Sequence, residues 1–254
     1  MTRPLQKAVA LITGSSSGIG AAIARRLAAE GAAVALLARR RDRLEDLAGT
    51  IRGDGGIALV LPADVTAEQE AAAAVDRTVG ELGRLDIVVN NAGVMLLGQA
   101  LNAPVAEWDQ MVELNLRGML YVTHAALPHL VRAAADEPRR VADLVTITST
   151  AGRVARPGSG VYALTKFGAT GFSEALRQEM LGQRVRVSIV EPGTVDTELT
   201  SHLRPEIREA AQRQTKSIEP LRPADIADAV AYIVTRDRRV AVNEMLVRAS
   251  DQTW

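Results

Sequence analysis

Short apolar runs alternate with segments of helical pattern from one end of the chain to the other. The segments between the runs, such as Ala21–Glu30 and Ala67–Leu82, are rich in alanine and have helical spacing. Strands that alternate with helices predict βαβ units and a parallel sheet, and right-handed crossovers then place helices on both faces. We therefore expect an α/β fold with a doubly wound parallel sheet of about seven strands. The predicted strands are Ala8–Ile12, Ala33–Leu37, Ile57–Leu61, Ile87–Val89, Asp143–Thr148, Val185–Val190 and Glu244–Val247.

The domain organisation is simple, because no linker or low-complexity segment interrupts this alternation. We expect a single domain over residues 1–254, with Gly31 just beyond the end of a helix, where glycine is common. The exception is the segment 197–217, which is polar and helical without a clean strand before or after it. Such an excursion from the sheet suits a substrate lid, and it also suits an ordinary pair of surface helices.

The composition narrows the classes of partner and chemistry. Hydrophobic residues make up 47% of the chain and aromatic residues only 3%, so aliphatic side chains and alanine must fill the core. The formal net charge is zero, which gives no electrostatic reason to expect a nucleic acid or an anionic membrane as a partner. The absence of cysteine excludes disulfides, a thiolate nucleophile and cysteine-ligated metal.

The remaining compositional signals concern metals and location. His124, His129 and His202 lack the spacing of a metal site, so we expect no metal and assign these side chains to the surface or to packing. The N-terminal apolar run is far too short to span a membrane, and we interpret it as the first strand. Together with the absence of cysteine, this favours the cytoplasm.

A glycine-rich loop follows the first predicted strand and precedes a helix. It runs from Thr13 to Gly20 with the spacing G-x-x-x-G-x-G. Glycines let the backbone approach a ligand closely, and the helix N-terminus offers free N–H groups to a pyrophosphate. The loop also fits a plain strand-to-helix connection, but its place after the first strand favours a dinucleotide site. The residues expected to contact the dinucleotide here are Gly14, Ser16, Ser17, Gly18, Ile19 and Gly20.

The end of the second predicted strand indicates which dinucleotide is bound. Many dinucleotide folds place an acidic residue there to bind the adenosine ribose, but this chain has Ala38, Arg39 and Arg40. A guanidinium can bind a 2′-phosphate that a carboxylate would repel, so we favour NADP, as NADPH, over NAD. Arg39 is the better candidate for the phosphate, and Arg40 could stack on the adenine. The alternative is a solvated basic helix start.

Tyr162 and Lys166 are four residues apart in a helical segment, which places both on one helix face. A nearby lysine cation lowers the pKa of a phenol, and such a phenol can exchange a proton with a carbinol or carbonyl oxygen. Ser149 ends the fifth predicted strand, where a hydroxyl could polarise a substrate carbonyl. Taken alone, a serine in that position is usually a turn or cap residue. A serine-hydrolase interpretation is weak, because no Gly-x-Ser-x-Gly motif surrounds Ser149.

Over nearly its whole length the sequence resembles the short-chain dehydrogenase/reductase family. The resemblance implies a Rossmann-type sheet, a nicotinamide dinucleotide as cofactor and a small carbonyl or alcohol substrate. The matching pieces are Thr13–Gly20, Asp64-Val65, Asn90-Asn91-Ala92-Gly93, Asn115, Ser149, Tyr162-x-x-x-Lys166, and Pro192-Gly193 with Thr197.

The resemblance also implies a role for each matching residue. Tyr162 would be the general acid/base, and Asn115 would hold a water in a proton relay to Lys166. Lys166 would also bind the nicotinamide ribose. The residues implied in further cofactor contacts are Asp64 and Val65 at the adenine, Asn91, Ala92 and Gly93 at the fourth strand's end, and Pro192, Gly193, Thr194, Val195 and Thr197 around the nicotinamide.

The activity implied is the interconversion of an aldehyde or ketone and an alcohol, and the sequence does not decide the direction. The alternative from another class is a non-catalytic NADP sensor or scaffold on the same fold. The family also implies a homotetramer through the long helices predicted over Asn102–Ala134 and Gly160–Leu181. A softer resemblance, carried by Val94–Gly98, Ala125–Leu130 and Arg248–Gln252, is to clavulanate dehydrogenase-like reductases of bacterial secondary metabolism.

The substrate pocket is predicted from positions that follow the motifs. These positions are mainly apolar, so we expect a substrate with an apolar portion. Arg153 is interpreted as a surface residue, with binding of a substrate carboxylate as the alternative. The predicted walls are Met95, Leu96, Val154, Val195, Leu199 and Leu203.

Overall fold

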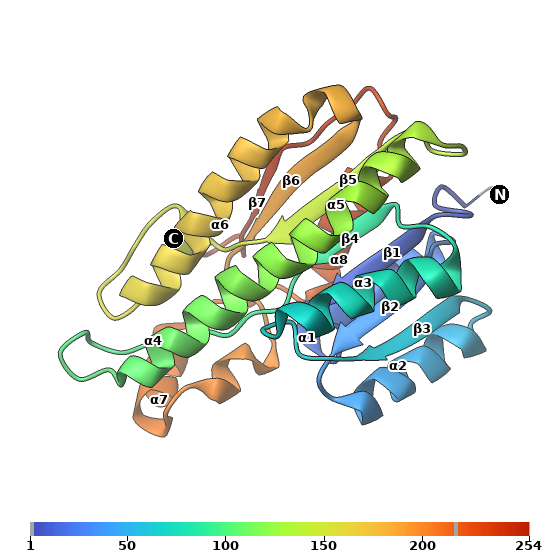
Figure 1. The fold of residues 1–254 in the computed structure, drawn as a ribbon. Coiled ribbons are helices and arrows are strands. Elements are labelled where there is room, and N and C mark those ends of the chain that lie inside the picture. The colour runs from blue at the N-terminus through green and yellow to red at the C-terminus, as the bar shows by residue number, and fades with distance from the viewer. Residues whose placement is uncertain (1–2, 216–217, 254) are drawn as a thin grey trace.

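A computed structural model describes residues 3–215 and 218–253 and contains a single parallel sheet (Figure 1). Its strand order is β3-β2-β1-β4-β5-β6-β7, and every neighbouring pair is parallel. The chain therefore winds outward from β1 and then crosses back to β4, as expected for a doubly wound sheet. The strands are β1 (Val9–Thr13), β2 (Ala33–Ala38), β3 (Ile57–Pro62), β4 (Ile87–Asn90), β5 (Ala142–Ile147), β6 (Val185–Pro192) and β7 (Glu244–Val247).

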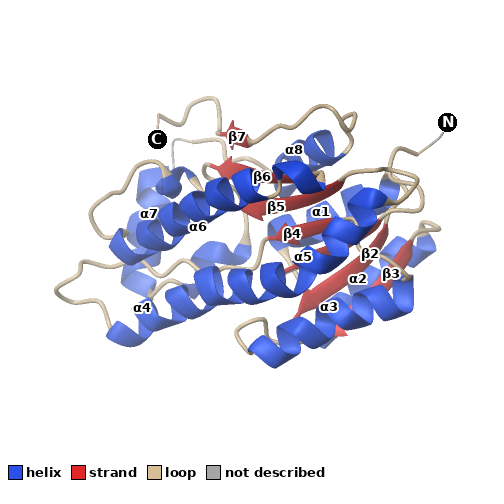
Figure 2. Ribbon diagram, turned by 45° about the horizontal axis from the view of Figure 1, so that its top comes forward, coloured by secondary structure: helices blue, strands red, loops and turns tan. Residues whose placement is uncertain are grey.

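Helices cover both faces of this sheet, as Figure 2 shows. The helices α1, α2 and α8 pack on one face, and α3, α5 and α6 pack on the other. The helices α4 and α7 lie at the end of the sheet where the strands terminate. The bounds are α1 (Gly18–Ala29), α2 (Arg41–Gly53), α3 (Glu68–Leu82), α4 (Val105–Val112), α5 (Met119–Ala135), α6 (Gly160–Glu179), α7 (Pro205–Thr215) and α8 (Pro223–Val234).

Each strand of the centre contributes alternate residues to two separate cores, because successive side chains of a strand point to opposite faces. In β1, Ala10 and Ile12 belong to the core beneath α1 and α8, while Leu11 belongs to the core beneath α3 and α5. All three side chains are fully buried. Burial on both faces explains why the strands read as continuous apolar runs rather than as alternating ones.

The long helix predicted over Asn102–Ala134 is interrupted. Residues 102–104 precede α4, and a π-helical turn over Glu113–Gly118 separates α4 from α5. A π turn inserts an extra residue into a helix and often marks a functional position, and this one contains Asn115. The second predicted helix is close to the observed one, since α6 ends at Glu179 and a 3₁₀ turn over Leu181–Gln183 follows.

The predicted lid segment leaves the sheet between β6 and α8. It contains a 3₁₀ turn over Glu198–His202 and then α7, while Lys216 and Ser217 lie outside the described residues. A parallel bridge between Val195 and Leu221 closes the base of the excursion. The segment is therefore anchored at both of its ends, and it lies over the end of the sheet where the strands terminate.

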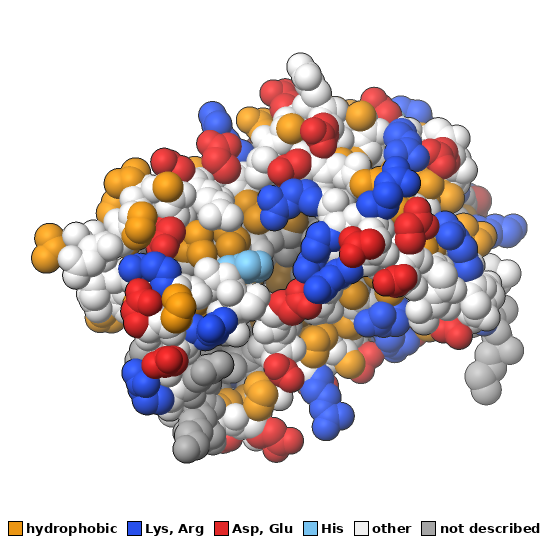
Figure 3. Space-filling view, turned by 90° about the horizontal axis from the view of Figure 1, so that it is seen from below, with side chains coloured by type: hydrophobic (Ala, Val, Ile, Leu, Met, Phe, Trp, Pro, Cys, Tyr) orange, Lys and Arg blue, Asp and Glu red, His pale blue; other side chains and the backbone are white. Residues whose placement is uncertain are grey.

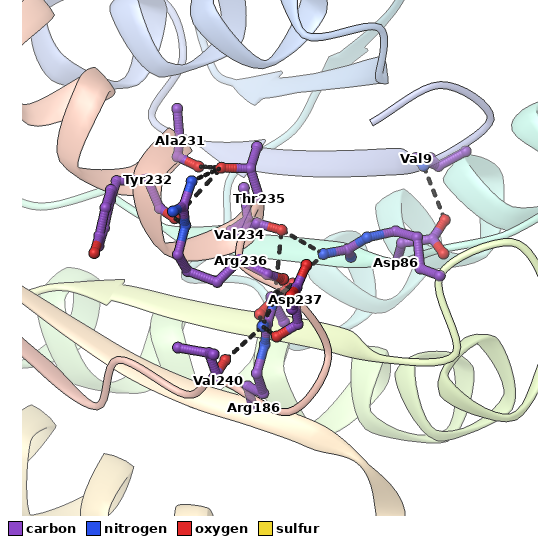
Figure 4. A network of polar contacts seen from close by, with 12 residues as sticks. Val9, Asp86, Arg186, Ala231, Tyr232, Val234, Thr235, Arg236, Asp237 and Val240 are labelled. Carbon is purple, nitrogen blue, oxygen red and sulfur yellow. Dashed lines mark hydrogen bonds and ion pairs between the residues drawn. The ribbon is translucent and has the colours of Figure 1, made fainter. Parts of the chain in front are cut away.

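A buried ionic network stabilises the opposite end of the sheet, where the strands begin (Figure 4). Arg186 of β6 donates to both carboxylate oxygens of Asp143 of β5, from Nε at 2.7 Å and from Nη2 at 3.0 Å. Its Nη1 donates to the carbonyl of Val240 at 2.7 Å, in the turn that leads to β7. A buried charge is tolerated when it is paired and hydrogen-bonded in this way. The network ties β5, β6 and the turn before β7 together at the end far from the carboxyl termini of the strands.

Candidate active site

A cavity of about 840 Å³ opens at the carboxyl ends of the strands, beside the point between β1 and β4 where the strand order reverses. Ligands of open α/β sheets bind at such a switch point. Figure 3 shows the mouth as a hollow with basic and acidic side chains beside it. Every residue predicted from the sequence to bind cofactor or to act in catalysis lines this cavity, except Gly20 and Asn115. Gly20 lies within the first turn of α1, and Asn115 lines a second cavity beside the first.

The glycine-rich loop has the backbone that a close ligand requires. Gly14 has a φ of 65°, and a Cβ there would lie 2.8 Å from Cα of Ala92. At Gly20 a Cβ would lie 2.4 Å from the carbonyl oxygen of Gly14. Asn91 fixes the loop from below, because its Nδ2 donates to the carbonyls of Thr13 at 2.9 Å and of Gly14 at 3.3 Å. The loop is thus held open toward the cavity with glycine where a side chain would collide.

The two arginines after β2 have different surroundings. Arg40 donates from Nε and Nη2 to the hydroxyl of Ser16 at 3.2 and 3.0 Å, and from Nη2 to that of Ser17 at 2.8 Å. Arg39 is more exposed, and its Nη1 lies 3.9 Å from Oδ2 of Asp64. Arg40 therefore faces the glycine-rich loop. The sequence favoured Arg39 for the phosphate and Arg40 for the adenine. Both arginines line the cavity.

Tyr162 and Lys166 are buried side by side on α6. Nζ of Lys166 lies 5.8 Å from the centre of the Tyr162 ring and donates to the carbonyl of Ile147 at 3.0 Å. Burial lowers the pKa of Lys166 from 10.5 to about 8. Burial also raises the pKa of Tyr162, and a hydrogen bond with Ser149 opposes this only in part. The expected lowering of the phenol pKa by Lys166 is therefore not found here, and the phenol stays protonated at neutral pH.

Ser149 both caps a turn and faces the cavity. Its Oγ accepts from the amide of Ala151 at 3.1 Å, at the start of a 3₁₀ turn over Thr150–Gly152. It also lines the cavity together with Tyr162, with which it shares the hydrogen bond. The cap and the proposed contact with substrate are therefore compatible, because a hydroxyl has more than one bonding direction.

Asn115 reaches the active site from the π-helical turn. Its Oδ1 accepts from the amide of Val94 at 2.8 Å, and its Nδ2 donates to the carbonyl of Val94 at 2.9 Å and to the hydroxyl of Thr165 at 3.2 Å. The side chain thus joins the loop after β4 to α6. A small cavity of about 10 Å³ lies between Asn115 and Lys166, which is about the volume that one water requires.

The predicted substrate walls are partly wrong. Met95, Val154, Val195 and Leu199 line the cavity. Leu96 does not, and it packs against a small apolar cluster that includes Tyr162. Leu203 is buried and also does not line the cavity. The pocket is more polar than expected, since Gln99, Arg156, Ser159 and His202 line it as well.

The structure also shows the surroundings of His202 and Arg153. His202 was assigned to the surface or to packing, and it is exposed. It also lines the cavity, at the end of the 3₁₀ turn over Glu198–His202. Arg153 does not line the cavity. Its guanidinium lies 2.7 Å from Glu191 and 2.6 Å from Glu244, and it therefore joins the ends of β6 and β7 rather than binding a carboxylate of the substrate.

Sequence reasoning also missed two residues of the cavity, Glu198 and Gln252. Gln252 comes from the C-terminal tail and accepts a hydrogen bond from the amide of Thr194 at 2.8 Å. Glu198 follows Thr197 and pairs with arginines beyond β2. The only signals in the sequence were an acidic residue at the start of the lid and a polar residue beyond the last strand.

Comparison with known proteins accounts for this arrangement. Residues 8–208 match the family described as short chain dehydrogenase. The chain belongs to the short-chain dehydrogenase family. A glycine betaine reductase of Emericella nidulans is 37% identical over 98% of the chain, which spans 19% of that much longer protein. An uncharacterized oxidoreductase of Staphylococcus aureus is 35% identical over 94% of the chain and 96% of its own length.

Solved structures of this family have the same fold. A serine dehydrogenase complexed with NADP+ is 30% identical, with a TM-score of 0.85 over 97% of this chain and 96% of that one. A 3-ketoacyl-(acyl-carrier-protein) reductase of Brucella melitensis complexed with NADH is 29% identical, with a TM-score of 0.84 over 97% and 98% of the two chains. The fold and the family expected from the sequence are confirmed. The narrower resemblance to clavulanate dehydrogenase-like enzymes is not.

Membrane-spanning helices and metal-binding clusters are both absent from the described residues. Over residues 3–215 and 218–253, no helix combines the length and the apolar character that crossing a membrane requires. Within the same ranges, histidine, aspartate and glutamate form no group that could hold a metal ion.

Proposed function

We propose that this short-chain dehydrogenase interconverts a carbonyl group, in an aldehyde or a ketone, and an alcohol with NADPH as the hydride donor. The observation that carries the proposal is the meeting of Ser149, Tyr162 and Lys166 at the end of a cavity that begins at the glycine-rich loop. A non-catalytic NADP sensor would have no need of that trio.

The cavity fits a dinucleotide. Its volume of about 840 Å³ is within the range of cofactor sites, and the loop residues Gly14 and Gly20 have no room for a Cβ. The N-terminus of α1 at Gly18 supplies free amides to a pyrophosphate. Asp64 and Val65 would then contact the adenine, and the residues from Pro192 to Thr197 the nicotinamide end.

When bound, NADPH supplies the hydride for the carbonyl carbon. Tyr162 donates a proton to the carbonyl oxygen. Its raised pKa keeps the phenol protonated at neutral pH but also makes it a weaker acid, so the transfer depends on stabilisation of the tyrosinate. The hydroxyl of Ser149 donates to the same oxygen and polarises the carbonyl. Lys166 would stabilise the tyrosinate that forms and would bind the nicotinamide ribose. In the reverse direction Tyr162 accepts the proton.

Asn115 supports the return of a proton to Tyr162. The small cavity between Asn115 and Lys166 has the volume of one water, and such a water would join Lys166 to the π-helical turn. The double hydrogen bond of Asn115 to Val94 keeps the turn in place. Asn115 thus acts as a positioning residue for the relay.

The preference for NADPH rests on the basic end of β2. Family resemblance alone does not decide between the two dinucleotides, since solved relatives hold NADP in one case and NADH in another. This chain has no acidic residue at Ala38, and it places Arg40 against the hydroxyls of Ser16 and Ser17. Guanidinium and hydroxyl donors together suit a phosphate.

The location, the metabolic role and the oligomeric state of the protein are proposals as well. We propose a cytoplasmic enzyme, supported by the absence of cysteine, and a role in secondary metabolism, supported by the softer resemblance to clavulanate dehydrogenase-like enzymes. We also propose a homotetramer, supported by apolar side chains on the outer face of α6.

The experiment that tests the activity follows NADPH oxidation with a panel of aldehydes and ketones. We expect turnover with at least one apolar carbonyl compound and its loss in Tyr162→Phe, with NADPH binding nearly intact, because only the hydroxyl that exchanges the proton is removed. Tyr232→Phe is the control, since Tyr232 lies half-exposed on α8 outside the cavity lining. Turnover of Tyr162→Phe near that of the unmodified protein would contradict the proposed mechanism.

A further inference from the structure

Glu198 reaches from the start of the lid to the basic end of β2. One oxygen of its carboxylate accepts from Nη1 of Arg40 at 3.1 Å, and the other accepts from Nη1 of Arg43 at 2.5 Å. The two arginines, Arg43 first and then Arg40, hold the pKa of the Glu198 carboxyl below its usual range. The carboxylate is therefore ionised at neutral pH, and it fastens the lid segment to α2 across the mouth of the cavity.

The same guanidinium of Arg40 faces the glycine-rich loop. Its Nε and Nη2 donate to the hydroxyls of Ser16 and Ser17, while its Nη1 donates to Glu198. Glu198, Arg40, Ser16 and Ser17 all line the cavity. The carboxylate of Glu198 is thus paired with the guanidinium that the proposed function assigns to the 2′-phosphate. Because both groups are anions, the carboxylate lowers the affinity of this position for the phosphate.

We propose that Glu198 is an internal competitor of the 2′-phosphate, so that a dinucleotide carrying this phosphate releases the Glu198 contact and one without it does not. The proposal rests on the proposed preference for NADPH. A phosphate monoester carries nearly two negative charges at neutral pH, against one for a carboxylate. The phosphate therefore prevails at Arg40, but it binds less tightly than it would at an unoccupied guanidinium.

The competition links cofactor choice to the lid. Coupling between two binding events is reciprocal. The contact of Glu198 with Arg40 therefore weakens binding of the 2′-phosphate by the same free energy by which the bound phosphate weakens that contact. The segment that carries Glu198 also carries Thr197, Leu199 and His202, which line the cavity on the substrate side. The adenosine end of the cofactor thus controls the contact between Glu198 and Arg40, which fixes the segment that lines the substrate side of the cavity.

The test uses fragments that separate the 2′-phosphate from the rest of the cofactor. The unmodified protein and Glu198→Gln are titrated by calorimetry with adenosine 2′,5′-bisphosphate and with adenosine 5′-phosphate. Glutamine keeps the shape of the side chain and removes the charge. We expect the variant to bind the bisphosphate about tenfold more tightly, the worth of one charge-assisted hydrogen bond. Binding of adenosine 5′-phosphate is expected to change less than about twofold, which also reports that the loop is folded.

Glu45→Gln is the matched control. Glu45 lies on α2 and pairs with Arg41 and Arg52 at 3.9 and 4.0 Å, but it does not line the cavity. The gain in Glu198→Gln should also shrink as salt is raised, because dissolved ions screen exposed charges. Glu45→Gln should show no gain at any salt concentration.

The outcomes separate this proposal from the proposed function. A Glu198→Gln protein that binds the bisphosphate no better than the unmodified protein, or more weakly, overturns the competition, since Glu198 would then only orient Arg40. An unmodified protein that binds the two fragments equally, with no gain in the variant, overturns the NADPH preference and the competition together. Activity with NADH alone in the carbonyl panel would identify the second case independently.

Discussion

Lys166 and Tyr162 are titratable groups on which burial acts in opposite directions. Burial disfavours the charged form, so it lowers the pKa of the ammonium to about 8 and raises that of the phenol. The four-residue spacing predicted that the two side chains share a helix face. It could not predict their protonation, because the burial comes from β5 and the loop after β4, which are distant in the sequence.

The first prediction concerns stability as a function of pH. Lys166 has a pKa of about 8 in the folded protein and an ordinary value of 10.5, so the unfolded chain binds its proton more tightly. Its charge therefore destabilises the fold below pH 8, and stability should rise between about pH 8 and 10.5. Lys166→Met should raise the free energy of unfolding at pH 7 by roughly 1–3 kcal/mol, since the lost hydrogen bond to Ile147 offsets part of the gain.

Urea unfolding at pH 7 and at pH 10 measures this difference, which should be smaller at pH 10. Lys7→Met is the control, because Lys7 is exposed and its removal should change neither value. A Lys166→Met protein that is less stable than the unmodified one at pH 7 would show that the buried charge is not a cost. The gain in stability should accompany a loss of turnover.

The second prediction concerns the cofactor. Ala38→Asp with Arg39→Leu installs a ribose acceptor and a charge that repels the phosphate, so the ratio of kcat/KM for NADPH over NADH should fall by about two decades or more. Arg40→Leu alone should lower the ratio more than Arg39→Leu alone, because the hydroxyls of Ser16 and Ser17 position Arg40. A ratio near one in the unmodified protein would refute the preference before any variant is made. The sequence identified the basic site, but not which neighbouring side chain faces the loop.

Among the elements, the π-helical turn and the C-terminal tail were the least predictable. Apolar spacing runs through Asn102–Ala134 as for one helix, and nothing in it marks the extra residue of the turn that carries Asn115. The tail after β7 returns to the loop after β6, and only the folded chain brings Gln252 to Thr194. By contrast, the seven strands of the sheet were predicted to within two residues at each end, and burial on both faces makes the apolar runs of the central strands plain.

The third prediction tests how the tail supports the loop after β6. A Cβ at Gly193 would lie 2.2 Å from Oε1 of Gln252, so Gly193→Ala should displace Gln252 and break its hydrogen bond to Thr194. We expect Gly193→Ala and Gln252→Ala each to raise the KM for NADPH about fivefold to tenfold, the effect of one neutral hydrogen bond. The double variant should be no worse than either single one, because both remove the same contact. Effects that multiply would contradict this coupling.

At the scale of the whole molecule, the site depends on contacts that cross the sheet. Helices on both faces of the sheet, and with them the two cores, were predictable from the alternation of strands and helices. A crevice at the carboxyl ends of the strands was also predictable, but the strand order that places it was not. The closing contacts were not, since Glu198 meets Arg40 over 158 residues of chain and Gln252 meets Thr194 over 58. These pairs are polar and partly exposed, so no hydrophobic pattern encodes them.

The last prediction concerns assembly. On α6 the face opposite Tyr162 and Lys166 carries Leu164 and Phe167, which are 57% and 45% exposed, followed one turn later by Gly171, whose Cβ position meets nothing within 4 Å. Large side chains beside a glycine on an outer helix face suit close packing against the same helix of a second copy. Obligate interfaces between subunits are more apolar than ordinary surface, and such an interface explains why these apolar side chains are exposed in the single chain.

We therefore expect light scattering to give the mass of a tetramer at micromolar concentration. Leu164→Glu should lower that mass, while Ile57→Glu should not, because Ile57 is 60% exposed on the distant edge strand β3. A monomer mass for the unmodified protein would reject the assembly, and a tetramer that survives Leu164→Glu would place the interface on another face.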